Sequence, residues 1–347
     1  MFINKIILDY VWIGGNNELR SKIRVFKLDK NIETMDKKIL LSQLEWNYDG
    51  SSTQQADGDD SEITLKAVNM YPEPIYAEKR YFIICDTYKS NGEPAKNNNR
   101  KLALELFNTK LEEKPWFGME QEYFMMKNLQ HPEPIGYKNS QKQGQYYCGV
   151  GAENAFGREI AEKHLKVCIL YGINISGINA EVAPGQWEFQ IGPCEGINAG
   201  DEMILARYLL IKIAEKENIS IDFEPKPLKG DWNGSGCHTN YSTKNMREGY
   251  GNTTGLDYIN NAIEKLADKH NEHMQVYGTG NEQRMTGKHE TASYDIFTFG
   301  VGNRGASVRI GNKTFTDKKG YFEDRRPSSN CDPYLVTSKI FETTCLN

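Results

Sequence analysis

Four short segments of the chain carry acidic, histidine and arginine side chains at spacings that suit a cation held beside an anion. In the strand-like run 117–123, Glu120 and Glu122 are two residues apart. Side chains two apart in a strand point to the same face, so these carboxylates would lie side by side. Such a pair favours a bound cation, although a solvated edge strand would show the same pattern.

The second segment is an acidic hairpin. Pro184 followed by Gly185 suits the two central positions of a type II turn, and a two-residue hairpin centred there would place Glu181 directly opposite Glu188. Opposed like charges destabilise a bare hairpin, so this pair either faces solvent or is neutralised by a cation. Apolar residues alternate along the following strand, so Glu188 and Gln190 would line its polar face.

The third segment, residues 233–240, is a glycine-rich approach to His238. Its glycines allow backbone amides to come close to a ligand. A lone histidine is more often structural than a ligand, but beside carboxylates it can complete an oxygen-rich metal site. A serine nucleophile elbow would need glycine at 233, where asparagine stands, so hydrolase chemistry is not favoured.

The fourth segment is rich in arginine, with Arg304, Arg309, Arg325 and Arg326. Guanidinium groups bind phosphates and carboxylates through two parallel hydrogen bonds, although single arginines are usually surface residues. No phosphate-binding loop motif with lysine and no G-x-G-x-x-G occurs, so a nucleotide would be held by arginines and metal. Together with the carboxylates and the histidine, these arginines indicate a site for Mg²⁺ or Mn²⁺ beside an anion, as in phosphoryl transfer.

The elements that must position these groups fall into two regions. Residues 5–30 are typical of a strand, a turn and a strand, and further strands are expected at 62–68 and 80–86, which predicts a small N-terminal sheet. The polar stretch 89–99 is interpreted as a linker, which gives domains 1–95 and 96–347.

The larger region is predicted to be a sheet with helices packed on it, an α+β arrangement. Helices are expected from 99, with Leu102, Leu106 and Leu111 on one stripe, and at 155–171, 202–217 and 255–273. Strands are expected at 117–126, 173–190, 236–242, 293–300 and 306–310.

Composition excludes several other classes of protein. A chain of 347 residues with 38% hydrophobic content can bury a core, and 42 basic against 47 acidic residues leave no basic surface for nucleic acid or an anionic membrane. The seven cysteines form no C-x-x-C pair, which is typical of reduced thiols in a cytosolic protein. No apolar run is long enough for a membrane span, and no targeting segment is recognised.

Taken in order, the motifs resemble those of glutamine synthetases over nearly the whole chain. The matching segments are 46–53, 120–122, 181–190, 233–242, 286–291, 303–309 and 321–328, extended by 330–334. The length resembles the compact eukaryotic class. The resemblance implies a small N-terminal β-grasp-like domain and a larger catalytic domain with a curved antiparallel sheet covered by helices.

The same resemblance implies a role for each matching residue. One metal would be held by Glu122, Glu181 and Glu188, and the metal touching the nucleotide phosphates by Glu120, His238 and Glu323. Substrate would be bound by Ser52, Trp232, Asn233, Gly234, Arg304 and Arg325. ATP would be bound by Glu188, Gln190, Pro193, His238, Asn240, Ser242, Arg304, Arg309 and Tyr321. The catalytic residues would be Asp49, Glu290 and Arg309.

The implied reaction is the ATP-dependent ligation of ammonia to the γ-carboxyl of L-glutamate through γ-glutamyl phosphate, with two to three Mg²⁺ or Mn²⁺ ions per site. Asp49 resembles the residue that binds ammonium and takes its proton, and Glu290 resembles a flap residue that closes the site against water. The implied assembly is a cytoplasmic decamer of two pentameric rings, with active sites formed between subunits.

Two alternatives remain: a γ-glutamyl ligase that uses another amine, and an inactive ring-forming homologue. Asp49 and Glu290 favour ammonium, and an inactive homologue should have lost ligands, none of which is missing. The departures from the family pattern are Lys288 in the flap, Gly302 and Gly305, and the acidic run 54–60. They bear on flap movement and ammonium access rather than on the reaction class.

Overall fold

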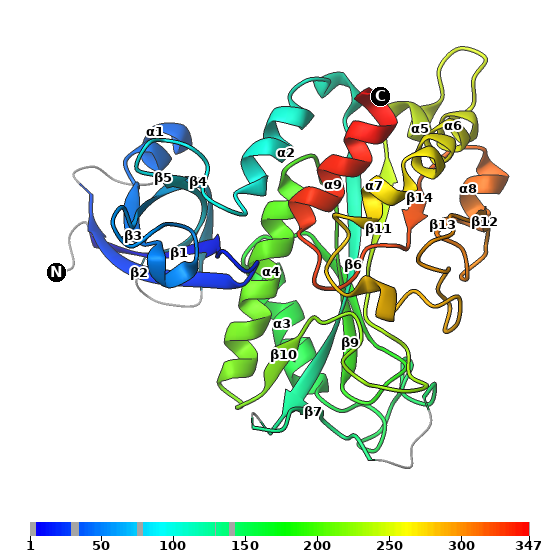
Figure 1. Cartoon of the computed structure of the whole chain (residues 1–347), viewed down its shortest axis with the longest axis horizontal. Coiled ribbons are helices and arrows are strands. Elements are labelled where there is room, and N and C mark those ends of the chain that lie inside the picture. Colours follow the sequence, from blue (N-terminus) through cyan, green and yellow to red (C-terminus); the bar gives the residue numbers. More distant parts are fainter. Residues whose placement is uncertain (1–4, 29–34, 75–78, 129, 139–142, 347) are drawn as a thin grey trace. The chain divides into compact units, whose positions relative to one another are not determined.

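The computed structural model describes residues 5–28, 35–74, 79–128, 130–138 and 143–346. The chain divides into two compact units, residues 1–102 with 167–173 and residues 103–166 with 174–347 (Figure 1). Among the described residues, no helix combines the length and apolar character that crossing a membrane requires.

The first unit is built on a five-stranded sheet in the order β2-β1-β5-β4-β3. Its elements are β1 (Lys5–Ile13), β2 (Leu19–Lys27), α1 (Lys37–Ser42), β3 (Trp46–Asp49), the 3₁₀ turn η2 (Ser51–Thr53), β4 (Glu62–Glu73) and β5 (Arg80–Lys89). β1 pairs with β5 in parallel, and the other neighbours are antiparallel. Leu8, Tyr10, Ile63, Leu65 and Ile83 form the centre of its core, each fully buried. The strands predicted in this region are confirmed.

The second unit is built on a nine-stranded sheet in the order β12-β13-β14-β11-β6-β9-β8, with β10 and β7 also paired to β6. Its strands are β6 (Trp116–Lys127), β7 (Glu133–Pro134), β8 (Ile175–Ala180), β9 (Gln186–Glu195), β10 (Ser220–Asp222), β11 (Cys237–Ser242), β12 (Phe299–Val301), β13 (Val308–Ile310) and β14 (Phe322–Asp324). All pairs are antiparallel except β12 with β13.

The helices are α2 (Asn99–Phe107), α3 (Arg158–Leu170), α4 (Asn198–Glu215), α5 (Lys244–Glu248), α6 (Gly255–Asp268), α7 (His270–Met274), α8 (Asn312–Asp317) and α9 (Pro333–Phe341). The 3₁₀ turns η3 (Leu111–Glu113) and η4 (Asn281–Gln283) and the π-helical turn η5 (Glu342–Leu346) complete the list. In the second unit, α4 packs on β6, β9 and β10, and α9 packs on α4 (Figure 1). The α+β class is therefore confirmed.

Three details of the predicted elements are wrong. The stripe of Leu102, Leu106 and Leu111 is not one buried helical face, because α2 ends at Phe107 and Leu102 and Leu111 are exposed. The helix expected over 255–273 is broken at Lys269 into α6 and α7. Of the strand expected over 293–300, only the end is extended, in β12.

The odd- and even-numbered residues of the central strand β6 lie on opposite faces of the sheet. Its odd-numbered residues from 117 to 125 are buried on the helix-covered face, and Gln121 is the polar member of that set. The guanidinium Nε of Arg207, on α4, donates to Gln121 Oε1 at 2.9 Å, and its Nη1 donates to Cys331 O at 2.8 Å. A buried guanidinium needs several acceptors, and Gln121 is one of those that Arg207 uses. These hydrogen bonds hold β6 at Gln121, between Glu120 and Glu122, on the face of the sheet that α4 covers.

Candidate active site

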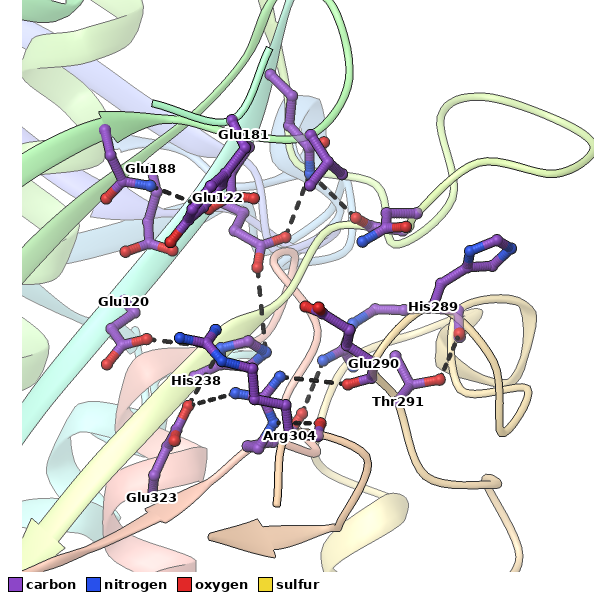
Figure 2. Close-up of a pocket in the computed structure, with 18 of the residues that line it drawn as sticks. Glu120, Glu122, Glu181, Glu188, His238, His289, Glu290, Thr291, Arg304 and Glu323 are labelled. Atoms are coloured by element: carbon purple, nitrogen blue, oxygen red, sulfur yellow. Dashed lines mark hydrogen bonds and ion pairs between the residues drawn. The ribbon is translucent and has the colours of Figure 1, made fainter. Parts of the chain in front are cut away.

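Strand register gathers the predicted acidic residues on one face of the nine-stranded sheet. Glu120 on β6 lies opposite His238 on β11, and Glu122 lies opposite Glu188 on β9. Glu323 on β14 is next to β11, opposite Asn240. Because antiparallel partners point to the same side, these side chains converge although they are up to about 200 residues apart in sequence. Figure 2 shows them as two groups, one around Glu122 and one around His238.

The predicted pairing of Glu181 with Glu188 is wrong. Glu188 lies opposite Asn179 on β8, and the Glu181 N–H donates to Gln186 O at 2.9 Å. The connection therefore has four residues instead of two, although Pro184 and Gly185 do occupy a turn, with Gly185 at φ 70°. Glu181 still reaches the site from the end of this loop, and Asn179 Nδ2 donates to it at 3.0 Å.

Glu120, His238 and Glu323 form the group best arranged to hold a metal ion. One ligand atom from each lies within 4.8 Å of the others. His238 Nδ1 is 3.6 Å from Glu120 Oε2 and 3.5 Å from Glu323 Oε1. Burial lowers the pKa of His238 well below its usual value, so the imidazole is neutral and offers a lone pair. Carboxylate oxygens with one imidazole suit Mg²⁺ or Mn²⁺.

The second acidic group has raised pKa values throughout. Burial raises the pKa of Glu122 to about 7. Burial and the neighbouring Glu122 raise that of Glu181 to about 8. Burial and the charges of Glu120, Glu122 and Glu181 raise that of Glu188 to about 9. Without a cation these carboxylates repel one another in a poorly solvated place, which is the electrostatic condition that a bound divalent ion would relieve.

Arginines surround the same site on the side of β13 and β14. Arg309 Nε lies 2.7 Å from Glu323 Oε2, and Arg325 Nη1 donates to Glu323 Oε1 at 2.7 Å. Arg325 also donates to the backbone oxygens of Arg304 and Glu290, at 3.0 and 3.2 Å. Glu323 therefore faces His238 and also anchors two guanidinium groups.

Strand β14 separates pocket residues from structural ones. Asp324, which follows Glu323 in β14, points to the opposite face of the sheet. There Arg326 donates to it through Nε at 2.9 Å and through Nη2 at 2.7 Å. Both side chains are completely buried. Arg326 is thus not part of the anion site, and its ion pair fixes the segment that presents Glu323 and Arg325.

Glycine is required where the 233–240 segment passes the pocket. A Cβ at Gly234 would come within 2.5 Å of Arg284 Cγ and Pro225 O, and one at Gly236 within 2.7 Å of Arg284 Nη2. The close approach lets the Gly236 N–H donate to Glu122 Oε2 at 2.9 Å. The backbone of this segment therefore binds and orients one of the site's carboxylates, and its approach to a ligand stays a prediction.

These groups line a cavity of about 690 Å³. Of the predicted site residues, it is lined by Glu120, Glu122, Glu181, Glu188, Gln190, Asn233, Gly234, His238, Glu290, Arg304, Arg309, Glu323 and Arg325. Glu290 belongs to the loop 286–293, which Figure 2 shows beside Arg304. The cavity therefore places acidic, basic and flap groups around one space.

A second cavity of about 500 Å³ shares Glu120 and Gln190 with the first. Pro193, Asn240, Ser242 and Tyr321, all predicted to bind ATP, line it. Its lining is mostly apolar and includes Trp116, over whose ring the Arg247 guanidinium lies at 4.0 Å. An apolar slot that joins a pocket lined by carboxylates and arginines suits a nucleobase with its phosphates directed toward those charged groups.

Three predicted residues lie elsewhere. Trp232 is buried in an apolar cluster with Phe124 and Leu228 and does not line either cavity. Asp49 and Ser52 belong to the first unit, where Asp49 is exposed at the end of β3.

The carboxylate of Asp49 accepts three hydrogen bonds from its own turn. Ser51 donates to Oδ1 through Oγ at 2.7 Å and through its backbone N–H at 3.0 Å, and Ser52 Oγ donates to Oδ2 at 2.9 Å. These bonds, first those of Ser51, lower the pKa of Asp49. The group is therefore kept as a carboxylate at neutral pH.

Several lining residues were missed from the sequence: Tyr147, Asn179, Gln186, Arg284 and His289 in the first cavity and Trp116 and Arg247 in the second. Trp116 was detectable in principle, since it starts the same strand as Glu120 with the same parity. Arg284 gave no signal, because one arginine in a polar segment is usually exposed.

Metal binding should stabilise the protein more at alkaline than at acid pH. Glu122, Glu181 and Glu188 have folded pKa values above the ordinary 4.5, so the folded apo protein holds more protons than the unfolded chain between about pH 5 and 9. Their effect on stability is then favourable at low pH and is lost as pH rises through these values. Mn²⁺ displaces the protons, so its benefit grows with pH.

We expect the increase in apparent Tm at saturating Mn²⁺ to be several-fold larger at pH 8.5 than at pH 6, measured by differential scanning fluorimetry at a fixed scan rate. Glu188→Gln should remove most of that difference, whereas the exposed Glu159→Gln should keep it. Equal increments at both pH values in the unaltered protein would contradict this electrostatic description.

Comparison with known proteins gives long and consistent matches. The family model described as "Glutamine synthetase, catalytic domain" matches residues 97–345. A glutamine synthetase nodule isozyme of Lupinus luteus is 51% identical over an alignment of 348 positions, which covers 99% of this chain and 95% of that protein. A cytosolic isozyme of Pinus sylvestris is 50% identical, with 99% and 94% covered, and a chloroplastic glutamine synthetase of Brassica napus is 51% identical, with 99% and 79% covered.

Proposed function

The chain belongs to the glutamine synthetase family, and on that premise we propose that the two cavities of its second unit carry out the ligation of ammonia to the γ-carboxyl of L-glutamate with cleavage of ATP. The activity is that of a glutamate–ammonia ligase, an ATP-dependent carbon–nitrogen ligase. The observation that carries the assignment of the site is the convergence of six glutamates, His238 and four arginines on one cavity, beside an apolar slot.

The proposed ligand sets follow the two acidic groups. Glu120, His238 and Glu323 would hold one divalent ion, and Glu122, Glu181 and Glu188 would hold another, with room in the acidic pocket for a third. The hard oxygen donors and the raised pKa values of the second group support Mg²⁺ or Mn²⁺. When bound, these ions would supply Lewis-acid polarisation of the phosphate oxygens.

In the first step, an oxygen of the glutamate γ-carboxylate attacks the γ-phosphorus of ATP, and the bond from phosphorus to the ADP oxygen breaks. Arg304, Arg309 and Arg325 offset the negative charge that builds up on the transferred group. Asn233 and Gly234, at the rim of the same cavity, are proposed to bind the glutamate. The product of this step is γ-glutamyl phosphate.

In the second step, the Asp49 carboxylate accepts a proton from ammonium, and ammonia attacks the γ-carbonyl carbon. The carbon–oxygen bond to phosphate then breaks, the nitrogen gives up a second proton to the departing phosphate, and glutamine and phosphate leave. The lowered pKa of Asp49 supports the binding of ammonium, because the group is a carboxylate at neutral pH. Ser52 orients Asp49, and Glu290 closes the cavity against water, which would otherwise hydrolyse the acyl phosphate.

We further propose a decamer of two stacked pentameric rings in which Asp49 of one subunit serves the catalytic cavity of its neighbour. The family resemblance over nearly the whole chain supports this assembly. The similarity to a cytosolic isozyme supports a cytoplasmic location. The proposed domain limits remain 1–95, with a β-grasp-like fold, and 96–347.

Oxygen-18 transfer tests the proposed chemistry. With L-glutamate labelled in its γ-carboxyl group, each phosphate formed with glutamine should carry one labelled oxygen, because the attacking oxygen stays with phosphorus when the carbon–oxygen bond breaks. Mass spectrometry of the phosphate measures this. Unlabelled phosphate alongside glutamine would contradict the acyl-phosphate route.

A further inference from the structure

The loop that presents Glu290 is held at the cavity rim by its neighbour His289. The Asn233 N–H donates to Gln143 Oε1 at 2.7 Å, so the amide NH₂ of Gln143 faces His289, whose Nδ1 is 3.0 Å away. Nδ1 therefore accepts, and the proton on Nε2 faces Asp231 Oδ1 at 2.9 Å. One imidazole thus joins the loop to two other segments.

The backbone at this point needs such support. His289 has φ 53° and Glu290 has φ 60°, two consecutive left-handed residues that both carry a Cβ. This conformation is disfavoured for L-residues other than glycine and persists where surrounding contacts over-determine it. Within the turn, Thr291 Oγ1 donates to Lys288 O at 2.8 Å, and Arg325 Nη2 holds Glu290 O at 3.2 Å. The contacts of His289 complete this set on the opposite side.

The partner Gln143 is itself well anchored. The next residue, Gly144, donates its N–H to Val182 O at 2.9 Å, in the loop between β8 and β9 that follows Glu181. Gln143 is partly buried, whereas the Asp231 side chain is 95% exposed. Exposed pairs contribute little, so the bond to Gln143 is the main tether.

We propose that His289 is a positioning residue that, chiefly through Gln143, holds the flap so that Glu290 stays over the cavity while the acyl phosphate is present. Figure 2 shows the His289 ring turned away from the carboxylates, so it acts on Glu290 through the backbone and not on the substrate. This inference rests on the proposed function of Glu290. The proposal implies that His289 helps to couple ATP cleavage to glutamine formation. Without its bond to Gln143, water reaches the acyl phosphate, and phosphate is released without glutamine.

The test measures glutamine and phosphate together in His289→Ala, Gln143→Ala and Asp231→Ala. Glu282→Ala serves as the control, since this exposed side chain lies in η4 just before the loop and makes no side-chain hydrogen bond among the described residues. We expect phosphate per glutamine to rise from about one to about ten in His289→Ala and Gln143→Ala, because each variant loses one or two hydrogen bonds. Asp231→Ala and Glu282→Ala should stay within about twofold of the unaltered protein.

Two further readouts separate this role from a general structural one. The double variant His289→Ala/Gln143→Ala should raise phosphate per glutamine no further than Gln143→Ala, which removes the His289 contact together with the bond to the Asn233 N–H. Amide exchange of Gly287 and Thr291, whose N–H groups bond within the flap, should become about tenfold faster in both single variants but not in Glu282→Ala.

Unchanged coupling and unchanged exchange in His289→Ala would overturn the proposal, and so would additive effects in the double variant. If the unaltered protein formed no glutamine, the proposed function would fall, while the exchange of Gly287 and Thr291 would still decide whether His289 holds the flap.

Discussion

Replacing Glu323 with glutamine is expected to lower kcat/KM for glutamine formation by roughly a thousandfold. The side chain is 3% exposed and meets three functional groups: His238 Nδ1 at 3.5 Å, Arg309 Nε at 2.7 Å and Arg325 Nη1 at 2.7 Å. Glutamine has nearly the same shape but no charge. The variant therefore loses one metal-facing carboxylate and leaves two guanidinium groups without their anion.

The measurement is steady-state glutamine formation over a range of Mg²⁺ or Mn²⁺ concentrations. Higher metal should recover little of the rate, because the arginines are also misplaced. Glu159→Gln, an exposed change of the same chemistry on α3, should keep the rate within about twofold. Turnover of Glu323→Gln within tenfold of the unaltered protein, with the same metal dependence, would be incompatible with the proposed role.

Replacing Asp49 with asparagine is expected to cost about a hundredfold or more in turnover and to raise the ammonium requirement steeply. Asparagine can keep the turn, since its carbonyl oxygen still accepts the bonds from Ser51, but it cannot attract a cation or take a proton. Glu45→Gln, at an exposed position of the same unit, removes the same charge from a side chain without a hydrogen bond among the described residues and is the matched control.

A change of pH makes the Asp49 test sharper. Raising the pH increases the fraction of free ammonia, so Asp49→Asn should recover part of its rate if the lost function is deprotonation. The unaltered protein and Glu45→Gln should gain much less. Ammonium dependence equal to that of the unaltered protein would remove Asp49 from the nucleophile site.

Local spacing was sufficient to predict much of the acidic face. Glu120 and Glu122 share a face because a strand repeats every two residues, and the apolar alternation from Trp187 onward correctly oriented Glu188. The turn at Pro184 was also recognised. What local rules could not provide was the register: Glu188 pairs with Glu122 on another strand, and that choice depends on how β9 packs on β6.

Burial was the weaker part of the sequence analysis. Leu102 and Leu111 fit a helical period, yet the helix ends at Phe107 and both side chains are exposed. Periodicity reports which residues would share a face, whereas only the tertiary structure decides whether that face is covered. Helix α4, in which residues 199–210 are all buried, was recognised because the segment 202–217 is apolar nearly all round.

The polar supports behind the site left no pattern in the sequence. Asp324 and Arg326 look in the sequence like an ordinary pair of charged residues next to Glu323, although the structure buries both. Arg207 and Gln121 are 86 residues apart in the sequence. The same is true of His289, which is separated from Gln143 by 146 residues. Contacts of this kind follow from the fold and cannot be derived from spacing, so roles for such residues emerge only once the strands are placed.

The most direct test of the account is the simultaneous measurement of glutamine and phosphate formed from ATP, L-glutamate and ammonium with Mg²⁺. A reaction without ammonium and one with Asp49→Asn accompany it. The account predicts equal amounts of both products, with glutamine absent without ammonium and strongly reduced in the variant. Phosphate without glutamine would point to another amine as acceptor, and no turnover by folded, metal-loaded protein would contradict the proposed function.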